Sequence, residues 1–159
     1  MRRITTAIAM TSIVVAAAAG SAPAFATAPQ APTGTQGTQG TQADGYLYAW
    51  QHPHAGGYMC KWDWHDTDWE DCSDGENLHN MQNNASDLWN NGKPGAYENV
   101  YFYYNERMGG AYACLSRGDS WPDLVNGGQT FNRGFWWSDG KGQKLENNIA
   151  SHAWTNDDC

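Results

Sequence analysis

The chain has little positive charge and lacks the short motifs that mark common enzyme classes. Its 159 residues include nine lysines and arginines against 17 aspartates and glutamates, which gives a formal net charge of −8. Contact with many phosphate groups needs a surplus of basic residues, so this composition excludes nucleic acid as a partner. The sequence contains no Gly-x-Ser-x-Gly, His-Glu-x-x-His or phosphate-loop motif, and we expect no enzymatic activity.

Long apolar runs occur only at the start of the chain. Two arginines precede an apolar run over residues 4–20, and Ala24-Phe25-Ala26 then supplies the small-x-small pattern that signal peptidases cleave. The run is too short to span a membrane. We interpret residues 1–26 as a Sec-type signal peptide cleaved after Ala26, and we expect a secreted protein with no membrane attachment after cleavage.

Residues 27–44 contain neither aromatic nor branched aliphatic side chains, and they include a Gly-Thr-Gln repeat. Such a segment cannot bury enough apolar surface to offset its ordering entropy, so we interpret it as a flexible linker. The remaining residues, 45–159, are enough for one domain with a modest core. Without the two leading arginines the net charge is about −10, and we expect this acidic domain to be a monomer.

Branched aliphatic residues are few in this domain, whereas all nine tryptophans and all eight tyrosines of the chain follow Asp44. We therefore expect an aromatic core. Small secreted domains of this kind are commonly cross-linked, and an even number of cysteines in an oxidising compartment predicts two disulfides. Three pairings are possible among Cys60, Cys72, Cys114 and Cys159.

The second half of the domain repeats the first. An aromatic strand, a Gly-Gly bend and a strand that ends in cysteine occur at 47–60 and again at 101–114, and the Asn-rich closing segments 85–91 and 150–156 also match. This duplication predicts one motif over about 45–92 and a second over about 97–159. It makes Cys60 and Cys114 equivalent, each with a partner in its own motif, which predicts the pairs Cys60–Cys72 and Cys114–Cys159.

Short aromatic or apolar runs, separated by Gly, Pro, Asn and Asp, are typical of β-strands. They predict strands at 46–51, 58–62, 86–89, 100–104, 111–115 and 150–154. No helical periodicity extends beyond one or two turns. Two equivalent sets of short strands predict an all-β sandwich made of two Greek-key motifs.

The aromatic strand, the Gly-Gly bend and the late Asn-Asn-x-x-Ser segment resemble the βγ-crystallin motif. In more detail, the chain resembles the secreted actinobacterial peptidase inhibitor family I36. The resemblance lies at Trp89-Asn90-Asn91-Gly92, Tyr97-x-x-Val100, Gly109-Gly110, Cys114, Trp121-Pro122-Asp123-Leu124 and Asn148 to Trp154. The resemblance covers essentially the whole domain. It implies a βγ-crystallin-like sandwich that inhibits an extracellular, thermolysin-like metalloprotease and requires no cofactor.

The resemblance also implies a reactive bond between a cysteine and an apolar residue after the second Gly-Gly bend. The matching bond is Cys114-Leu115, followed by Ser116. A substrate-like loop must be stiff, because a floppy loop would lose affinity to its ordering entropy. Inhibitory members of this family close a very short loop with a second cysteine a few residues after the reactive bond. This chain has Asp119-Ser120 at that place. The competing interpretation is that Cys114 is a structural half-cystine like Cys60.

Calcium binding is an alternative function that the resemblance implies. βγ-Crystallin domains bind calcium through side-chain and carbonyl oxygens of the Asn/Asp-rich segments. The corresponding residues are Asn147, Asn148 and Ser151 in the second motif and Gln82, Asn83 and Ser86 in the first. The competing interpretation is that these side chains only cap turns. The alternative module is a calcium-binding or killer-toxin-like crystallin domain.

The run from Trp62 to Cys72 alternates tryptophans with acidic residues. It could be a strand with its aromatics inward, or a loop that holds a cation or a basic or sugar ligand. Five acids within nine residues are also typical of a solvated face. A small secreted cell-wall hydrolase stays a second alternative, with a carboxylate pair such as Glu98 and Glu106 as acid and base.

Overall fold

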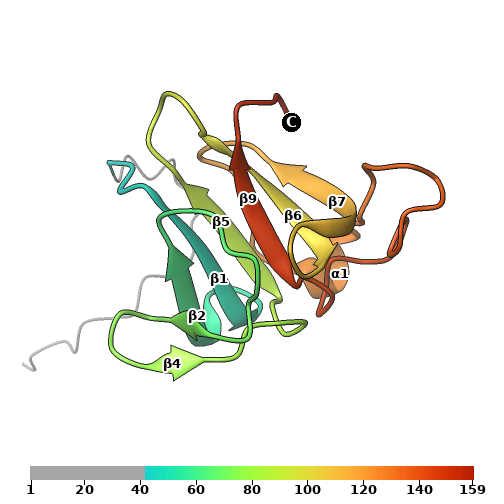
Figure 1. The fold of residues 1–159 in the computed structure, drawn as a ribbon. Coiled ribbons are helices and arrows are strands. Elements are labelled where there is room, and N and C mark those ends of the chain that lie inside the picture. The colour runs from blue at the N-terminus through green and yellow to red at the C-terminus, as the bar shows by residue number, and fades with distance from the viewer. Residues whose placement is uncertain (1–41) are drawn as a thin grey trace, which may run out of the picture. The chain divides into compact units, whose positions relative to one another are not determined.

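The computed structural model describes residues 42–159, which are drawn in colour in Figure 1. The predicted signal peptide, residues 1–26, and all but the end of the predicted linker, residues 27–44, lie outside the described residues. Within the described part, no helix has the length and apolar character needed to cross a bilayer.

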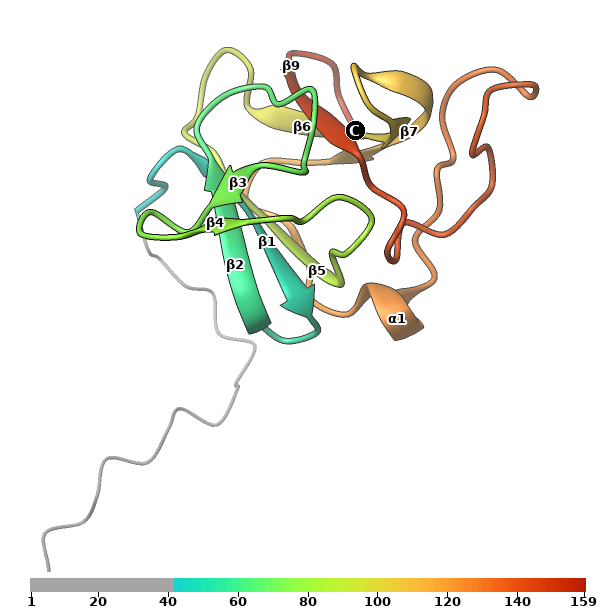
Figure 2. The same cartoon turned by 60° about the horizontal axis from the view of Figure 1, so that its bottom comes forward.

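Two antiparallel sheets form the domain, as Figures 1 and 2 show from two directions. The first has the order β2-β1-β5-β8, and its strands are β1 (Tyr46–His52), β2 (Gly56–Trp62), β5 (Asp87–Asn91) and β8 (Ser120–Trp121). The second has the order β7-β6-β9, and its strands are β6 (Asn99–Asn105), β7 (Gly109–Leu115) and β9 (Ser151–Thr155). A short hairpin pairs β3 (Cys72–Ser73) with β4 (Leu78–His79), and one turn of helix, α1 (Leu124–Gly127), follows β8.

Each sheet includes a segment from the other half of the domain. β8 belongs to the second half, yet it pairs with β5 of the first sheet through Leu88 and Trp121. In return, Asp66 from the first half forms a bridge with His152 at the outer side of β9. In both sheets the last strand of a half lies beside the first, which is a Greek-key connection. The strand order confirms the predicted all-β fold of two Greek-key motifs.

The six predicted strands are all present, and their ends differ from the prediction by one or two residues. The equivalence between the two motifs, however, is wrong by one residue. Leu47 pairs with Trp62 in the first hairpin, and Val100 pairs with Leu115 in the second. Counting from these pairs, Cys60 corresponds to Ala113, not to Cys114. Because side chains alternate between faces, the shift places the two cysteines on opposite faces of their sheets.

The closing segments carry the same shift. Asp87 pairs with Trp50, and Ser151 pairs with Tyr103 at the equivalent position, so Asp87 corresponds to Ser151. The backbone agrees, because Asn83 and Asn147 both have φ of 54°. The first-motif set Gln82, Asn83 and Ser86 therefore lies one residue before the true counterparts of the second-motif set.

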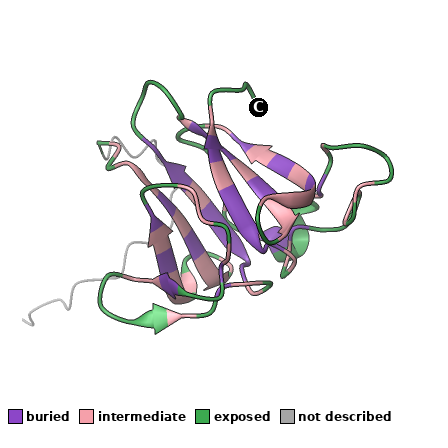
Figure 3. Ribbon diagram, in the orientation of Figure 1, coloured by how far each residue is buried: buried purple, intermediate pink, exposed green. Residues whose placement is uncertain are grey.

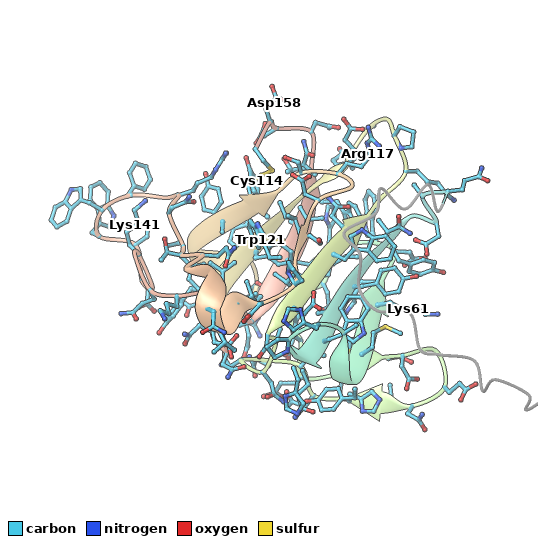
Figure 4. The ribbon with its side chains drawn as sticks, turned by 180° about the vertical axis from the view of Figure 1, so that it is seen from behind. Lys61, Cys114, Arg117, Trp121, Lys141 and Asp158 are labelled. Atoms are coloured by element: carbon cyan, nitrogen blue, oxygen red, sulfur yellow. A yellow bond between two sulfur atoms is a disulfide. The ribbon has the colours of Figure 1, made fainter. Side chains whose placement is uncertain are left out.

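Both predicted disulfides are confirmed: Cys60 bonds to Cys72, and Cys114 bonds to Cys159. Their surroundings differ. Cys60 is fully buried and faces the core, whereas Cys114 is half-buried on the outer face of β7, where Figure 4 shows its sulfur near the C-terminal residues. The first bond attaches the β3–β4 hairpin to the core, and the second attaches the C-terminus to β7.

One core lies between the two sheets, and Figure 3 shows the buried residues recurring along their strands. The core contains five large aromatic side chains, which are Trp62, Trp69, Phe102, Phe131 and Trp154. Aliphatic residues fill most of the remaining space, so the predicted aromatic core is correct only in part. The tyrosines at 46, 48, 101, 103 and 112 are half-buried on the outer faces instead.

The run of tryptophans and acids after β2 is a loop, not a strand. It crosses to the second sheet, where Asp66 and His152 exchange two backbone hydrogen bonds of 3.1 and 2.8 Å. Trp62 and Trp69 are buried and stacked at 4.6 Å, while Trp64 is 54% exposed. The segment is therefore a loop. That it holds a cation or a basic or sugar ligand stays a prediction.

His152 lies fully buried beneath this loop. Trp69 Nε1 donates to His152 Nδ1 at 2.8 Å, and His152 Nε2 lies 2.8 Å from the carbonyl oxygen of Trp64. One ring nitrogen must accept and the other must donate, so the imidazole is neutral. Burial, the largest cause, lowers the pKa of His152 to about 3.

Candidate functional site

The predicted reactive bond, Cys114-Leu115, lies in the last part of β7. Leu115 is 1% exposed and pairs with Val100 in the sheet, and its carbonyl oxygen accepts from Asn90 Nδ2 at 3.1 Å. Ser116 follows the strand, and its carbonyl oxygen accepts from Asp119 N at 3.1 Å. The side chain that a protease pocket would hold is therefore in the core, and β7 would have to leave the sheet to present it.

A different segment stands away from the sheets. Residues 131–144, called here the aromatic loop, connect α1 with β9 and extend beyond β7 in Figure 1. The loop carries Phe135, Trp136 and Trp137, which are 67, 82 and 63% exposed. Phe135 stacks on Trp137 with ring centroids 4.7 Å apart, and Trp136 meets Trp137 edge-on at 5.4 Å. Exposed apolar clusters of this kind mark interaction sites.

The base of the aromatic loop is anchored in the core. Phe131 is fully buried and meets Tyr104 edge-on at 5.5 Å. Its amide donates to the carbonyl oxygen of Gln143 at 2.9 Å, and its carbonyl oxygen accepts from Gly142 N at 3.0 Å. The two ends of the loop are thus hydrogen-bonded to each other at a fixed, buried position.

Further contacts hold both arms of the aromatic loop. Arg133 and Tyr112 of β7 exchange backbone hydrogen bonds of 3.2 and 2.8 Å, and Asp139 O accepts from Ala111 N at 2.7 Å. Lys141 Nζ donates across the loop to the carbonyl oxygens of Asn132 and Gly134, at 2.6 and 3.2 Å. Figure 4 shows Lys141 within the protruding loop. The three exposed aromatics are therefore displayed by a preorganised loop.

Sequence reasoning did not identify this loop. The available signal is three adjacent aromatic residues, Phe135-Trp136-Trp137, that follow Gly134 and precede Ser138-Asp139-Gly140. A turn-rich setting predicts neither a strand nor a helix for them, and three large apolar side chains in a turn have no core to fill. That combination indicates a displayed aromatic group.

The predicted calcium residues lie where the two motifs meet. Asn83 N donates to Ile149 O at 2.8 Å, and Asn147 N donates to Ala85 O at 3.2 Å, so the two segments hold each other reciprocally. Ser151 Oγ accepts from Met108 N and donates to Asn105 O, at 3.0 and 2.7 Å. These contacts are structural, and they fit the turn-capping interpretation.

The remaining predicted ligands have mixed surroundings. Asn148 Nδ2 donates to two backbone carbonyl oxygens, and Gln82 Nε2 donates to Glu106 Oε1 at 2.8 Å. Ser86 Oγ donates to Glu146 Oε1 at 2.9 Å, whereas Glu146 Oε2 is buried and has no partner within residues 42–159. No cluster of three or more His, Cys, Asp or Glu side chains suited to a metal occurs in this part of the chain.

Only the comparison with solved structures found proteins similar to this chain. No family model and no curated protein matches the chain. Solved structures similar to it include a domain from work on the evolution of the eye-lens βγ-crystallin fold, with 16% identity, a TM-score of 0.47 and coverage of 74% of this chain and 91% of that one.

Two further similar structures come from microbial sources. A βγ-crystallin from an archaeon is 16% identical with a TM-score of 0.45, covering 69% of this chain and 95% of that one. Spherulin 3a from Physarum polycephalum is 17% identical with a TM-score of 0.44, covering 77% and 95%. The fold assignment rests on the strand order and register above, and the resemblance to family I36 stays a prediction.

Proposed function

We propose that this chain is a secreted, monomeric peptidase inhibitor whose aromatic loop enters the substrate cleft of an extracellular, thermolysin-like metalloprotease. The observation that supports the proposal is the display of Phe135, Trp136 and Trp137 by a loop that is hydrogen-bonded on both arms. Large rigid aromatic side chains often contribute most of the binding free energy at protein interfaces. Their apolar rings suit the hydrophobic pocket of such a protease.

Preorganisation explains how a loop of this kind inhibits instead of being digested. A loop already held in its bound shape loses little entropy on binding. If a protease cut beside Trp136, one arm would stay bonded to β7 through Arg133 and the other through Asp139. Lys141 would also still bridge the arms. The new ends would remain in the cleft, and religation or slow release would follow.

The bond Cys114-Leu115, with Ser116, is the other proposed reactive site. The first experiment separates the two sites: the full chain is incubated with thermolysin-like, subtilisin-like and trypsin-like proteases, residual activity is titrated, and any cut is mapped by mass spectrometry. We expect inhibition of the thermolysin-like enzyme and a cut within residues 134–138. A cut at Cys114-Leu115 would move the reactive site to β7, and no inhibition at micromolar concentration would contradict the inhibitor function.

Calcium binding is a second candidate, because one carboxylate oxygen between the motifs has no partner among residues 42–159. The buried Oε2 of Glu146 lies on the carboxylate that Ser86 contacts, and a cation bound there would satisfy it. Calcium at about 100 times its dissociation constant would stabilise the fold by about 2.7 kcal/mol. Melting curves with calcium and with a chelator test this, with Glu146→Gln as the variant and exposed Glu70→Gln as its control. Equal melting temperatures in both conditions would exclude the site.

A further inference from the structure

A groove lies where the start of β1, the loop after β2 and the connection between the motifs meet. Its cavity volume is about 310 Å³, and its walls include Tyr46, Asp63, Trp64, Lys93 and Tyr97, with Trp154 of β9. None of these residues belongs to the aromatic loop or to the predicted calcium segments. The volume is at the lower end of the range of about 300–1,000 Å³ for ligand pockets.

Two exposed aromatic side chains form one wall of the groove. Trp64 is 54% exposed and Tyr97 is 45% exposed, and their rings meet edge to face with centroids 5.5 Å apart. Trp64 also lies 4.3 Å from the ring of His65, whose Nδ1 accepts from Trp154 N at 2.9 Å. The Trp64 ring therefore has a supported position while more than half of its surface stays open to solvent.

Tyr97 adopts an unfavourable backbone conformation at an exposed position. Its φ is 56°, in the left-handed region that bulky side chains rarely adopt, and Asn156 Oδ1 accepts from its amide at 2.6 Å. Such a conformation costs about 1–3 kcal/mol. Glycine would avoid the cost, and the exposed tyrosine ring recovers little of it by burial. Strain of this kind at an exposed aromatic residue is typical of functional sites.

Two charged side chains of the groove, one acidic and one basic, are free to contact a ligand. Neither Asp63 nor Lys93 forms a side-chain hydrogen bond or ion pair with another described residue. Trp154 Nε1 is buried and has no partner among residues 42–159, whereas Asp44 is already engaged by Tyr46 N and the Tyr48 hydroxyl. The lining thus offers a carboxylate acceptor, an ammonium donor and an aromatic wall.

We propose that this groove binds a saccharide. A pyranose ring presents an apolar face of C–H groups, which stacks on an open aromatic ring such as Trp64, and a rim of hydroxyls that both donate and accept. Asp63 accepts from such hydroxyls and Lys93 donates to them. An isolated cation would meet the opposing charge of Lys93, and an apolar ligand would leave the carboxylate and the ammonium unpaired. The volume suits one or two sugar rings.

The test measures binding of named oligosaccharides to the full chain. Cellotetraose and chitotetraose are titrated by calorimetry and by saturation-transfer NMR, with tetramethylammonium and lysine amide as cationic probes. We expect at least one tetrasaccharide to bind saturably with a dissociation constant below about 10 mM. Trp64→Ala should weaken it about tenfold or more, and Trp136→Ala, in the aromatic loop, should not change it.

Tyr97→Gly gives the sharper readout, because it should raise stability while lowering affinity. Relief of the strained backbone should raise the melting temperature by about 4 °C, and loss of the wall should weaken saccharide binding. Arg107→Gly is the matched control, since Arg107 also has a positive φ, of 54°, at an exposed position outside the groove. It should raise the melting temperature with binding intact.

Three results would overturn the proposal. They are no saturable tetrasaccharide binding, binding of the cationic probes alone, or saccharide binding that Trp64→Ala leaves unchanged. The aromatic loop shares no residue with the groove, so Trp64→Ala should leave protease inhibition unchanged. Failure of the saccharide site and failure of the inhibitor function are therefore distinguishable.

Discussion

The two motifs hold their hairpin bends with different chemistry at the same position of the sheet. In motif two the hydroxyl of Ser151 accepts from Met108 N and donates to Asn105 O. In motif one the equivalent residue is Asp87, whose carboxylate accepts from Ala55 N at 2.7 Å. Burial, the largest cause, raises the pKa of Asp87. The strand register thus places an acceptor side chain next to the amide of the bend in both motifs, and that acceptor can be a carboxylate or a hydroxyl.

The exposed aromatic residues of both proposed sites lie outside the strands that the motifs share. The aromatic loop lies between α1 and β9 in motif two, where motif one instead has the short β3–β4 hairpin before β5. The groove uses the loop after β2, which carries Trp64, together with the connection between the motifs. The duplicated strands thus provide a common frame, and the insertions on it provide the candidate surfaces.

The largest expected effect is that of Ser151→Asp, which gives motif two the side chain that motif one has at the equivalent position. Ser151 is fully buried and both accepts and donates, whereas an ionised carboxylate only accepts. The substitution buries a charge next to the carbonyl of Asn105, and we expect a loss of about 3 kcal/mol or more in unfolding free energy. Urea denaturation at pH 7 measures the loss. A loss below about 1 kcal/mol would show that motif two accepts a carboxylate at this position as readily as motif one does.

An intermediate effect concerns His152, whose equivalent in motif one is Leu88. The folded pKa of His152 is about 3, below the unfolded value of 6.5. The unfolded chain therefore takes up the proton first as the pH falls, so this stability is fully present above pH 6.5 and is lost toward pH 3. Between pH 7 and pH 5 we expect His152 to account for a loss of about 2 kcal/mol.

His152→Leu, which copies the residue of motif one, isolates this contribution. It should remove that part of the pH dependence and also lower stability at pH 7 by about 1–3 kcal/mol, because Trp69 Nε1 and the Trp64 carbonyl lose their partner. Denaturation curves of both proteins from pH 5 to 7 give the difference. Parallel pH profiles would show that His152 is not the group responsible.

The smallest effect is expected for Asp87→Ser, which gives motif one the side chain of motif two. The hydroxyl keeps an acceptor for Ala55 N and removes a buried charge, so stability at pH 7 should change by less than about 1 kcal/mol. Asp87→Ala is the matched control and should cost about 1–2 kcal/mol, since it leaves that amide unpaired. Equal stabilities for the Ser and Ala variants would mean that the hydrogen bond contributes nothing measurable.

Local patterns in the sequence were enough to predict the strands and both disulfides. Short aromatic or apolar runs and the Gly-Gly bends indicate where β1, β2, β6 and β7 lie. The register between copies was missed because Cys60 and Cys114 were matched by identity, although they follow their bends at different distances. The pairing prediction succeeded nonetheless, since each cysteine does have its partner within its own motif.

The candidate sites could be predicted far less well, because they depend on tertiary contacts. The stiffness of the aromatic loop comes from Phe131 in the core and from bonds to β7. Neither contact follows from the local sequence. Likewise, Cys114-Leu115 matches a family pattern in the linear sequence, but the pairing of β7 with β6 determines that the Leu115 side chain faces the core. Whether a side chain is exposed to a partner therefore depends on how the whole domain packs.

The most direct test of the account is a titration of a thermolysin-like protease with the full chain and with Trp136→Ala. The account predicts stoichiometric inhibition by the parent and a loss of affinity of about 30-fold or more in the variant, as expected for an interface residue worth about 2 kcal/mol. Trp64→Ala serves as a second exposed tryptophan outside the loop and should inhibit like the parent. Inhibition by Trp136→Ala equal to that of the parent, or none by the parent, would contradict the role of the aromatic loop.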